Sequence, residues 1–324
     1  MSNLDRHPAA RELGGLEATS PGPALDLLPG REVILGESTR VRRLLPTLGR
    51  RMIGAWAFVD HYGPDDIADG SGMQVAPHPH TGLQTVSWLL EGAVHHRDSL
   101  GSDVQFGPGQ LALMTAGHGI AHSEQSPVAH PRYLHGAQLW VALPDAHRET
   151  APAFEHHATL PGWTSDGVAA TVLMGSFGGA ASPGTAYSPL VGVDLDMTAG
   201  ADIEVPLDPD FEYGVLSLAG TGQVDGVSLV PGSLLYLGSG RSDVALRGGH
   251  AQRPSRMLLL GGEPFEEHIV MWWNFVGRDH NEIARSRDDW MTGRRFGTVR
   301  NYDGDPLPAP PMPSTPLKPR GRQR

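Results

Sequence analysis

The sequence predicts an all-β protein made of two tandem β-barrels, followed by a short helix near the C-terminus. Glycine (42) and proline (28) together make up about a fifth of the 324 residues, which is more than a helical bundle tolerates. Short apolar, β-branched and aromatic runs alternate with glycine- and proline-rich turns, which is typical of antiparallel sandwiches and barrels. One such run also occurs twice, which points to two copies of one unit.

The clearest strands lie in the first half of the chain. Residues 84–90 (QTVSWLL) form a β-branched and aromatic run that ends in a Glu-Gly turn, and residues 94–98 are expected to pair with it as a hairpin. Further strands are expected at 104–106, 111–114 and 139–143.

The repeat lies 123 residues further along the chain. Residues 108–117 (PGQLALMTAG) align without gaps with residues 231–240 (PGSLLYLGSG), and the turn at 90–92 parallels a turn at 218–220. Duplication of one barrel explains both matches. The alternative is that two unrelated β-domains share a common type of turn.

The ends of the chain differ in composition from the middle. The capping-box pattern from Asp279 to Glu282 predicts the start of a helix. We expect a mobile leader at 1–28, a first barrel at 29–150, a second barrel at 151–275, a helical segment at 276–302 and a disordered, proline-rich basic tail at 303–324.

Charge and composition exclude several classes of function. A net charge of −11 argues against direct nucleic-acid binding. The absence of cysteine excludes disulfides, thiolate metal sites and cysteine nucleophiles. No apolar run approaches the length of a membrane span, and the N-terminal residues contain no apolar signal core. We therefore expect a cytoplasmic protein with no membrane contact.

Histidine is the unusual component, because twelve of the sixteen fall between residues 61 and 157. His78 and His80 are alternate residues, and so are His122 and Glu124. Alternate side chains on a strand share one face, so each pair can point at one centre. Proline between the first two places them at a strand start or edge. Three imidazoles and one carboxylate suit Fe(II), Cu(II), Ni(II) or Zn(II), and the pattern does not choose among these metals.

Eight other histidines of this region are more simply interpreted as ordinary hydrogen-bonding residues. Two of them, His96 and His118, lie near the proposed ligands and are candidates for supporting them. The whole group is His95, His96, His118, His130, His135, His147, His156 and His157.

At these residues the sequence resembles the pirin family of iron-binding bicupins. The matching phrases are HPHTGLQTVSWLLEG (78–92), HRDSLG (96–101), MTAGHGIAHSE (114–124), QLWVALP (138–144) and WNFVGR (273–278). The resemblance covers about residues 30–295. It implies two stacked cupin (jelly-roll) barrels, with one metal, Fe(II) by preference, in the first.

The resemblance places the metal ligands on His78, His80, His122 and Glu124. In the second copy, the 123-residue offset puts Ala245 opposite His122 and Arg247 opposite Glu124. The second barrel is therefore expected to hold no metal.

The resemblance implies two classes of function. One is a quercetin 2,3-dioxygenase that cleaves a flavonol with O2, with Glu124 as the base that accepts the substrate's proton. The alternative is a metal- or redox-dependent regulatory protein that acts through contacts with a protein partner, without catalysis. The apolar wall of a substrate site is expected from Trp56, Phe58, Leu83, Trp88 and Met114, although core packing is an alternative role for each.

Overall fold

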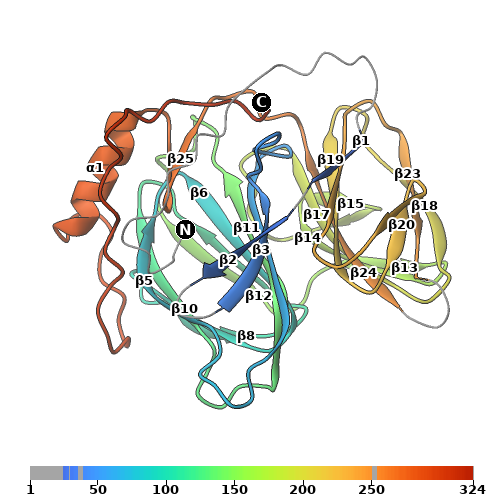
Figure 1. Ribbon diagram of the computed structural model, residues 1–324, viewed down its shortest axis with the longest axis horizontal. Helices are drawn as coiled ribbons and strands as arrows, with labels where there is room; N and C mark the ends of the chain where they lie inside the picture. Colours follow the sequence, from blue (N-terminus) through green and yellow to red (C-terminus); the bar gives the residue numbers. More distant parts are fainter. Residues whose placement is uncertain (1–24, 29, 36–38, 250–253, 324) are drawn as a thin grey trace.

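Two β-barrels lie side by side along the long axis of the molecule (Figure 1). The structure is a computed structural model that describes residues 25–28, 30–35, 39–249 and 254–323. The predicted all-β class, with two jelly-roll barrels and one short C-terminal helix, is confirmed. Within the described residues, the helix falls short of the length and apolarity that crossing a bilayer requires.

Eleven strands build the first barrel. They are β2 (Arg31–Leu35), β3 (Thr39–Leu45), β4 (Trp56–Asp66), β5 (Gln74–His80), β6 (Leu83–Glu91), β7 (Val94–Asp98), β8 (Asp103–Phe106), β9 (Leu111–Thr115), β10 (Ile120–Gln125), β11 (Tyr133–Ala142) and β12 (Ala153–His157). One wall is a seven-stranded sheet of order β12-β9-β6-β11-β4-β3-β2, and the other is a four-stranded sheet of order β5-β10-β7-β8.

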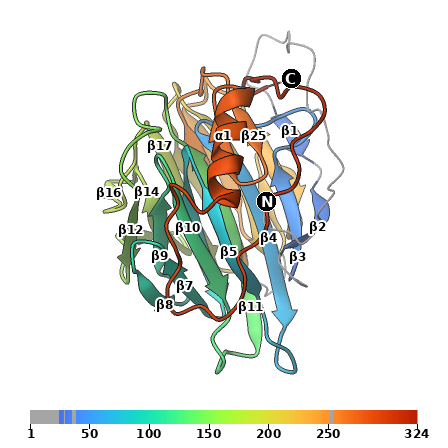
Figure 2. The same ribbon diagram turned by 90° about the vertical axis from the view of Figure 1, so that its left-hand side faces the viewer.

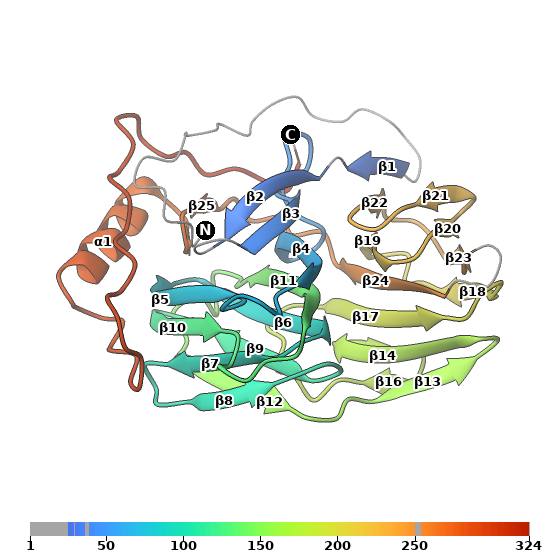
Figure 3. The same cartoon turned by 60° about the horizontal axis from the view of Figure 1, so that its bottom comes forward.

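The second barrel repeats this plan. Its strands are β13 (Gly162–Ser165), β14 (Val168–Met174), β15 (Ser176–Phe177), β16 (Ala180–Ala181), β17 (Leu190–Met197), β18 (Asp202–Pro206), β19 (Glu212–Ala219), β20 (Gly222–Val224), β21 (Val227–Leu229), β22 (Leu234–Leu237), β23 (Asp243–Arg247) and β24 (Ser255–Gly262). A further strand, β1 (Leu25–Leu28), pairs with β22, so the larger sheet has the order β1-β22-β19-β24-β17-β14-β13. The facing sheet has the order β18-β23-β20-β21 (Figure 3).

The predicted hairpin between residues 84–90 and 94–98 is wrong. The strand β6 pairs with β11 and β9, whereas β7 pairs with β10 and β8. The Glu-Gly turn instead carries the chain from one wall of the barrel to the other, with Gly92 at a φ of 97°. A turn followed by a second β-rich run has the same sequence pattern in either case, because pairing partners are set by the whole barrel.

The strand registers agree with a duplicated barrel. Leu111 of β9 lies opposite Trp88 of β6, and Leu234 of β22 lies opposite Leu216 of β19. These are the same positions of the repeat in both barrels. The alignment changes at β23, where Val244 and Leu246 are buried and Arg247 is exposed.

The C-terminal helix α1 (His280–Met291) begins where the capping pattern predicts. The side chain of Asp279 accepts a hydrogen bond from the backbone N–H of Glu282 at 2.9 Å. The Glu282 carboxylate accepts from the N–H of Arg278, one residue before the position of a standard capping box. The helix packs on the first barrel, next to two short strands, β25 (Val270–Trp272) and β26 (Phe275–Gly277) (Figure 2).

The proline-rich tail is ordered, in contrast to the disorder expected for residues 303–324. It crosses the first barrel and returns to the region between the barrels (Figures 2 and 3). Leu307 is buried and its N–H donates to the carbonyl of Pro77 at 2.8 Å, while Arg51 donates to the carbonyls of Gly321 and Gln323. Apolar side chains between the prolines bury surface, and the proline carbonyls still accept hydrogen bonds, so composition alone overestimates disorder.

The last four residues of the expected leader form a strand. Leu25–Leu28 form β1 within the sheet of the second barrel. Residues 1–24 lie outside the described residues.

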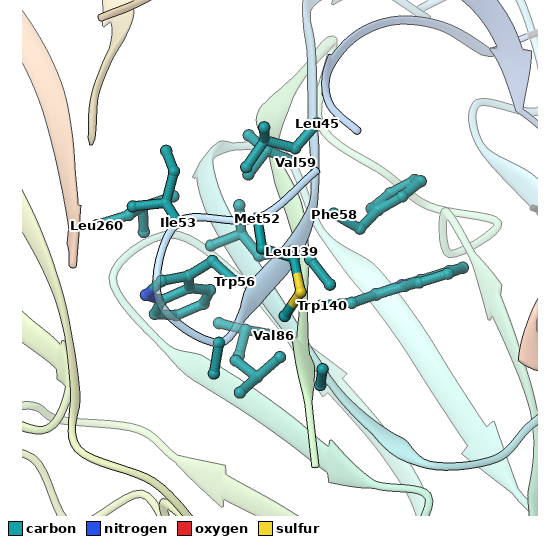
Figure 4. Close-up of a cluster of buried hydrophobic side chains, with 14 of the residues drawn as sticks. Leu45, Met52, Ile53, Trp56, Phe58, Val59, Val86, Leu139, Trp140 and Leu260 are labelled. Carbon is teal, nitrogen blue, oxygen red and sulfur yellow. The ribbon is translucent and has the colours of Figure 1, made fainter. Parts of the chain in front are cut away.

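The contact between the barrels is apolar and centres on Trp56 (Figure 4). Its ring packs among residues of both barrels, including Ile53 and Leu260. The indole N–H lies within hydrogen-bond distance of two carbonyls of the second barrel, Val191 at 3.2 Å and Gly261 at 3.1 Å. A buried, hydrogen-bonded tryptophan of this size fixes the position of one barrel relative to the other.

Candidate metal centre

Three imidazoles converge inside the first barrel. His78 and His80 come from β5 and His122 from β10, and the pairing of these strands places His122 opposite His78. The three side chains are buried, and the Nε2 atoms of His80 and His122 lie 3.1 Å apart. Pro79 between the first two is tolerated because β5 is the edge strand of its sheet.

The hydrogen bonds of two of these rings fix which nitrogen carries the proton. His78 Nδ1 lies 2.8 Å from the carbonyl of Ala76, and His80 Nδ1 lies 3.2 Å from the carbonyl of Asn274. A carbonyl only accepts, so each Nδ1 carries the hydrogen and each Nε2 presents a lone pair. Lone pairs directed at one point inside a protein are the arrangement that a bound cation stabilises. The residues present therefore fit a divalent transition metal.

The ionisation of the three histidines favours the same conclusion. Burial lowers the pKa of His78 to about 3. Burial and the neighbouring imidazoles hold the pKa of His80 and of His122 well below the usual value. All three rings are therefore neutral near pH 7, which is the form that binds metals.

Glu124 reaches the same cavity from β10 and also belongs to a second cluster. Its carboxylate forms a cluster with His96 and His122, whose potential ligand atoms lie within 4.8 Å of one another. His78, His80 and His122 form the other such cluster, so His122 belongs to both. Ser87 donates to Glu124 Oε1 at 3.0 Å, and burial raises the pKa of the carboxyl group.

The cavity between these side chains is small, with a volume of about 20 Å³. That is room for about one water molecule. Its lining consists of Leu35, Phe58, Asp60, Val75, His78, His80, His122, Glu124, Gln138 and Trp140.

The apolar wall differs from the expected one. Phe58 lines the cavity, whereas Trp56, Leu83, Trp88 and Met114 belong to the apolar core. Trp140, which no sequence pattern singled out, stacks on Phe58 with ring centroids 4.2 Å apart and meets His80 edge-on. Both aromatic rings come from the long central strands β4 and β11.

A buried ion pair supports this wall. Asp60, two residues after Phe58 on β4, lines the cavity and accepts from Arg43 of β3 at 2.8 and 2.6 Å. The guanidinium of Arg43 also lies over the Phe58 ring, 4.5 Å from its centroid. Alternation along β4 was the available signal for Asp60, since Phe58 and Asp60 share a strand face.

The two histidines proposed as supporting residues have different surroundings. His96 Nδ1 lies 3.4 Å from His122 Nδ1, so His96 does contact a proposed ligand. His118 is exposed on the turn before β10, and no described side-chain contact joins it to the cavity.

The corresponding region of the second barrel is apolar. Val244 and Leu246 of β23 belong to its core, while Arg247 pairs with Asp202 on the outside. The 123-residue offset therefore does not give the structural equivalents of His122 and Glu124 in this strand, because the buried positions of β23 are Val244 and Leu246. A larger recess of about 510 Å³ in this barrel has aromatic walls, including Phe177 and Phe211. The metal-ligand clusters found among the described residues all lie in the first barrel.

Comparison with known proteins agrees with the motifs. The Pirin family model matches residues 38–141, and the model for the pirin C-terminal cupin domain matches residues 192–297. A Pseudomonas aeruginosa protein provisionally named a quercetin 2,3-dioxygenase is 47% identical over 290 residues, which are 89% of this chain and 91% of that protein. A Caulobacter vibrioides pirin-like protein is 37% identical, over 78% of this chain and 88% of that protein.

Solved structures show the same relationship. The crystal structure of a quercetin 2,3-dioxygenase from Acinetobacter baumannii has a TM-score of 0.86 and 42% identity, and the match covers 90% of this chain and 96% of that one. An Escherichia coli pirin solved in complex with nickel(II) shares the fold at 17% identity, with a TM-score of 0.59 over 75% of this chain and all of that one. The chain described here belongs to the pirin family.

Proposed function

We propose that the protein is a metal-dependent dioxygenase that cleaves a quercetin-type flavonol with O2. One divalent transition metal would be held by His78, His80, His122 and Glu124, with Fe(II) as the first choice and Cu(II), Ni(II) or Zn(II) as alternatives. The observation that carries the proposal is the convergence of imidazole Nε2 lone pairs on a buried cavity. The substrate class comes from the two similar proteins with quercetin 2,3-dioxygenase names.

The site residues divide the work of such a reaction. A metal in this position would supply Lewis-acid stabilisation of the deprotonated flavonol and a binding position for O2. The Glu124 carboxylate would accept the proton of the flavonol 3-hydroxyl, while Ser87 holds one of its oxygens. Phe58 and Trp140 would pack against the aromatic rings and exclude water. The ring then opens to an ester, the two oxygen atoms of O2 are incorporated into the products, and carbon monoxide leaves.

The size of the cavity favours a second candidate function. A volume of about 20 Å³ does not hold a flavonol, so the substrate must displace parts of the wall such as Leu35 or Trp140. A metal- or redox-dependent regulatory protein would need no such opening, because its metal would act on a protein partner through the surrounding surface. Under either proposal the protein is cytoplasmic and, with a charge of −11, makes no direct contact with nucleic acid.

Aerobic turnover of quercetin, measured with protein of known metal content, distinguishes the dioxygenase from the regulatory protein. Protein loaded with Fe(II), Cu(II) or Ni(II) is mixed with quercetin, and flavonol absorbance, O2 uptake and carbon monoxide release are followed together. We expect all three to change in proportion, and His122→Ala to abolish them. His130→Ala is the matched control, because His130 lies on an exposed loop. Wild-type protein that holds one metal per chain but leaves quercetin, related flavonols and O2 unchanged would contradict the dioxygenase and favour the regulator.

A further inference from the structure

We infer that His96 and Asp98 are positioning residues that hold His122 in the tautomer whose Nε2 lone pair faces the metal. The inference rests on the metal site proposed above, and it concerns residues outside the four proposed ligands. It assigns a role to a buried histidine–aspartate pair on β7 that has no part in the mechanism given so far.

The three side chains form a continuous chain of polar contacts. His122 Nδ1 lies 3.4 Å from His96 Nδ1, and His96 Nε2 lies 3.2 Å from Asp98 Oδ2. All three side chains are buried, with exposed fractions of 2% or less. Water is therefore excluded from competing for these contacts.

The far end of this chain is fixed by the backbone. Asp98 Oδ1 accepts hydrogen bonds from the N–H groups of Leu100 and Ser102, each at 2.9 Å. These bonds leave Oδ2 as the oxygen that faces His96. They and the contact with His96 lower the pKa of Asp98 against the opposing effect of burial, so Asp98 is an anion that only accepts.

The position of each proton follows from that anion. His96 Nε2 must carry a hydrogen to donate to Asp98, so His96 Nδ1 is an acceptor. His122 Nδ1 must then carry a hydrogen to donate to His96, which leaves its Nε2 with a free lone pair. That lone pair lies 3.1 Å from His80 Nε2, at the centre of the cluster.

The geometry also explains why this ligand needs such support. The tautomers of His78 and His80 are set by backbone carbonyls, which accept hydrogen bonds and never donate them. The tautomer of His122 depends on two side chains instead. His96 is held in place by Phe154, on which it stacks with a centroid distance of 4.0 Å and an interplanar angle of 7°.

An isosteric change at position 98 should reverse the whole chain. In Asp98→Asn, the N–H groups of Leu100 and Ser102 require an acceptor and so keep the amide oxygen in the place of Oδ1. The amide NH2 then faces His96 Nε2 and donates to it. His96 donates from Nδ1 to His122 Nδ1, and the hydrogen of His122 moves to Nε2, where it blocks metal binding.

The experiment reads the tautomer directly in metal-free protein. Long-range ¹H–¹⁵N correlation spectra of histidine-labelled protein distinguish Nδ1–H from Nε2–H rings. We expect an Nδ1–H ring for His122 in the wild type and an Nε2–H ring in Asp98→Asn. Zn(II) affinity, measured by competition with a chromophoric chelator, should fall about 10- to 100-fold in Asp98→Asn.

Three further variants distinguish control of the tautomer from a general loss of structure. Asp103→Asn removes the charge from an aspartate on β8 that contacts His95, and should leave both readouts unchanged. His96→Gln offers an oxygen to His122 and an amide group to Asp98, so it should retain more Zn(II) affinity than His96→Leu. The inference fails if His122 stays an Nδ1–H ring in Asp98→Asn with wild-type Zn(II) affinity. A tautomer switch in a chain that binds no metal would support the positioning role and contradict the metal site.

Discussion

The buried carboxylate of Glu212, the first residue of β19, accepts a hydrogen bond from Arg322 near the C-terminus at 2.9 Å. The same side chain accepts from the N–H of Gly54 in the first barrel at 2.7 Å and from the hydroxyl of Tyr236 in the second at 2.8 Å. Glu212 therefore joins the first barrel, the second barrel and the C-terminal tail at one point.

Loss of the arginine at this junction should destabilise the whole protein. Arg322→Ala leaves the buried carboxylate with one fewer charged donor, although Arg50 remains 3.7 Å away. We expect the free energy of unfolding in urea to fall by about 1–3 kcal/mol. Lys318→Ala removes an exposed charge from the same tail and should change it by less than about 0.5 kcal/mol. Equal effects of the two variants would show that the tail makes no specific contact at Glu212.

The ion pair beside the cavity should be far more important than an exposed one. Arg43→Met leaves Asp60 buried without its partner, and we expect a loss of about 3–5 kcal/mol in unfolding free energy. Arg132→Met breaks a pair with Asp66 whose side chains are 65% and 45% exposed, so its cost should be below about 1 kcal/mol. Urea denaturation of both variants tests the difference, and a cost below 1 kcal/mol for the first would contradict the role given to this pair.

The free energy of unfolding should fall in mild acid because of the buried pair His61 and His135. His61 Nε2 lies 3.0 Å from His135 Nε2, and burial together with His135 lowers the pKa of His61 to about 4. In the unfolded chain His61 has the ordinary histidine pKa of about 6.5. Between pH 4 and 6.5 the unfolded chain therefore binds more protons at His61 than the folded chain does. Unfolding is therefore favoured as pH falls, by about 2 kcal/mol between pH 7 and pH 5 for His61 alone.

The comparison that isolates this effect is His61→Gln against wild type. Urea midpoints measured from pH 5 to pH 8 should show a shallower pH dependence for the variant below pH 7. Above pH 7 the two curves should run parallel, since the histidine is neutral in both states. Parallel curves over the whole range would rule out this pair as a source of acid sensitivity.

The metal content should be one ion per chain. The four proposed ligands line a single cavity of the first barrel, whereas the core of the second barrel is apolar. Elemental analysis of loaded protein should give a ratio near one, and His122→Ala should abolish it. Chelation of the metal should also lower the midpoint of thermal unfolding, because an ion that binds only the folded state stabilises it. Two ions per chain that survive His78→Ala would contradict this assignment.

The fold was predictable from local patterns because strand and turn signals are short-range. Strand β6, the turn at Gly92 and the helix start at Asp279 all lie where their sequences indicate. The partner of β7 was not predictable in the same way, since pairing depends on how the whole chain closes into a barrel. The ordered tail was missed for a related reason, because the surface that Leu307 covers exists only after the barrel has formed.

For the candidate site, strand periodicity predicted that three histidines lie close together, and they do. His78, His80 and His122 share a face because alternate residues of paired strands must do so. Glu124 is grouped with His96 because the two residues lie opposite each other where β10 pairs with β7, and no spacing rule reveals which strand β7 pairs with. Trp140 was hidden because an aromatic residue in a β-rich run has the same pattern whether it packs in the core or lines a cavity.

Each end of the chain packs on the barrel that is formed by the other half of the chain. Leu25–Leu28 extend the larger sheet of the second barrel, while Leu307 is bonded to Pro77 in the first. If a protease cleaves the chain between His157 and Gly162, the two fragments should therefore stay associated, because each contributes a segment to the barrel of the other. The two fragments should elute together in size-exclusion chromatography until a denaturant separates them. Neither half should fold into a stable, soluble protein when it is expressed alone.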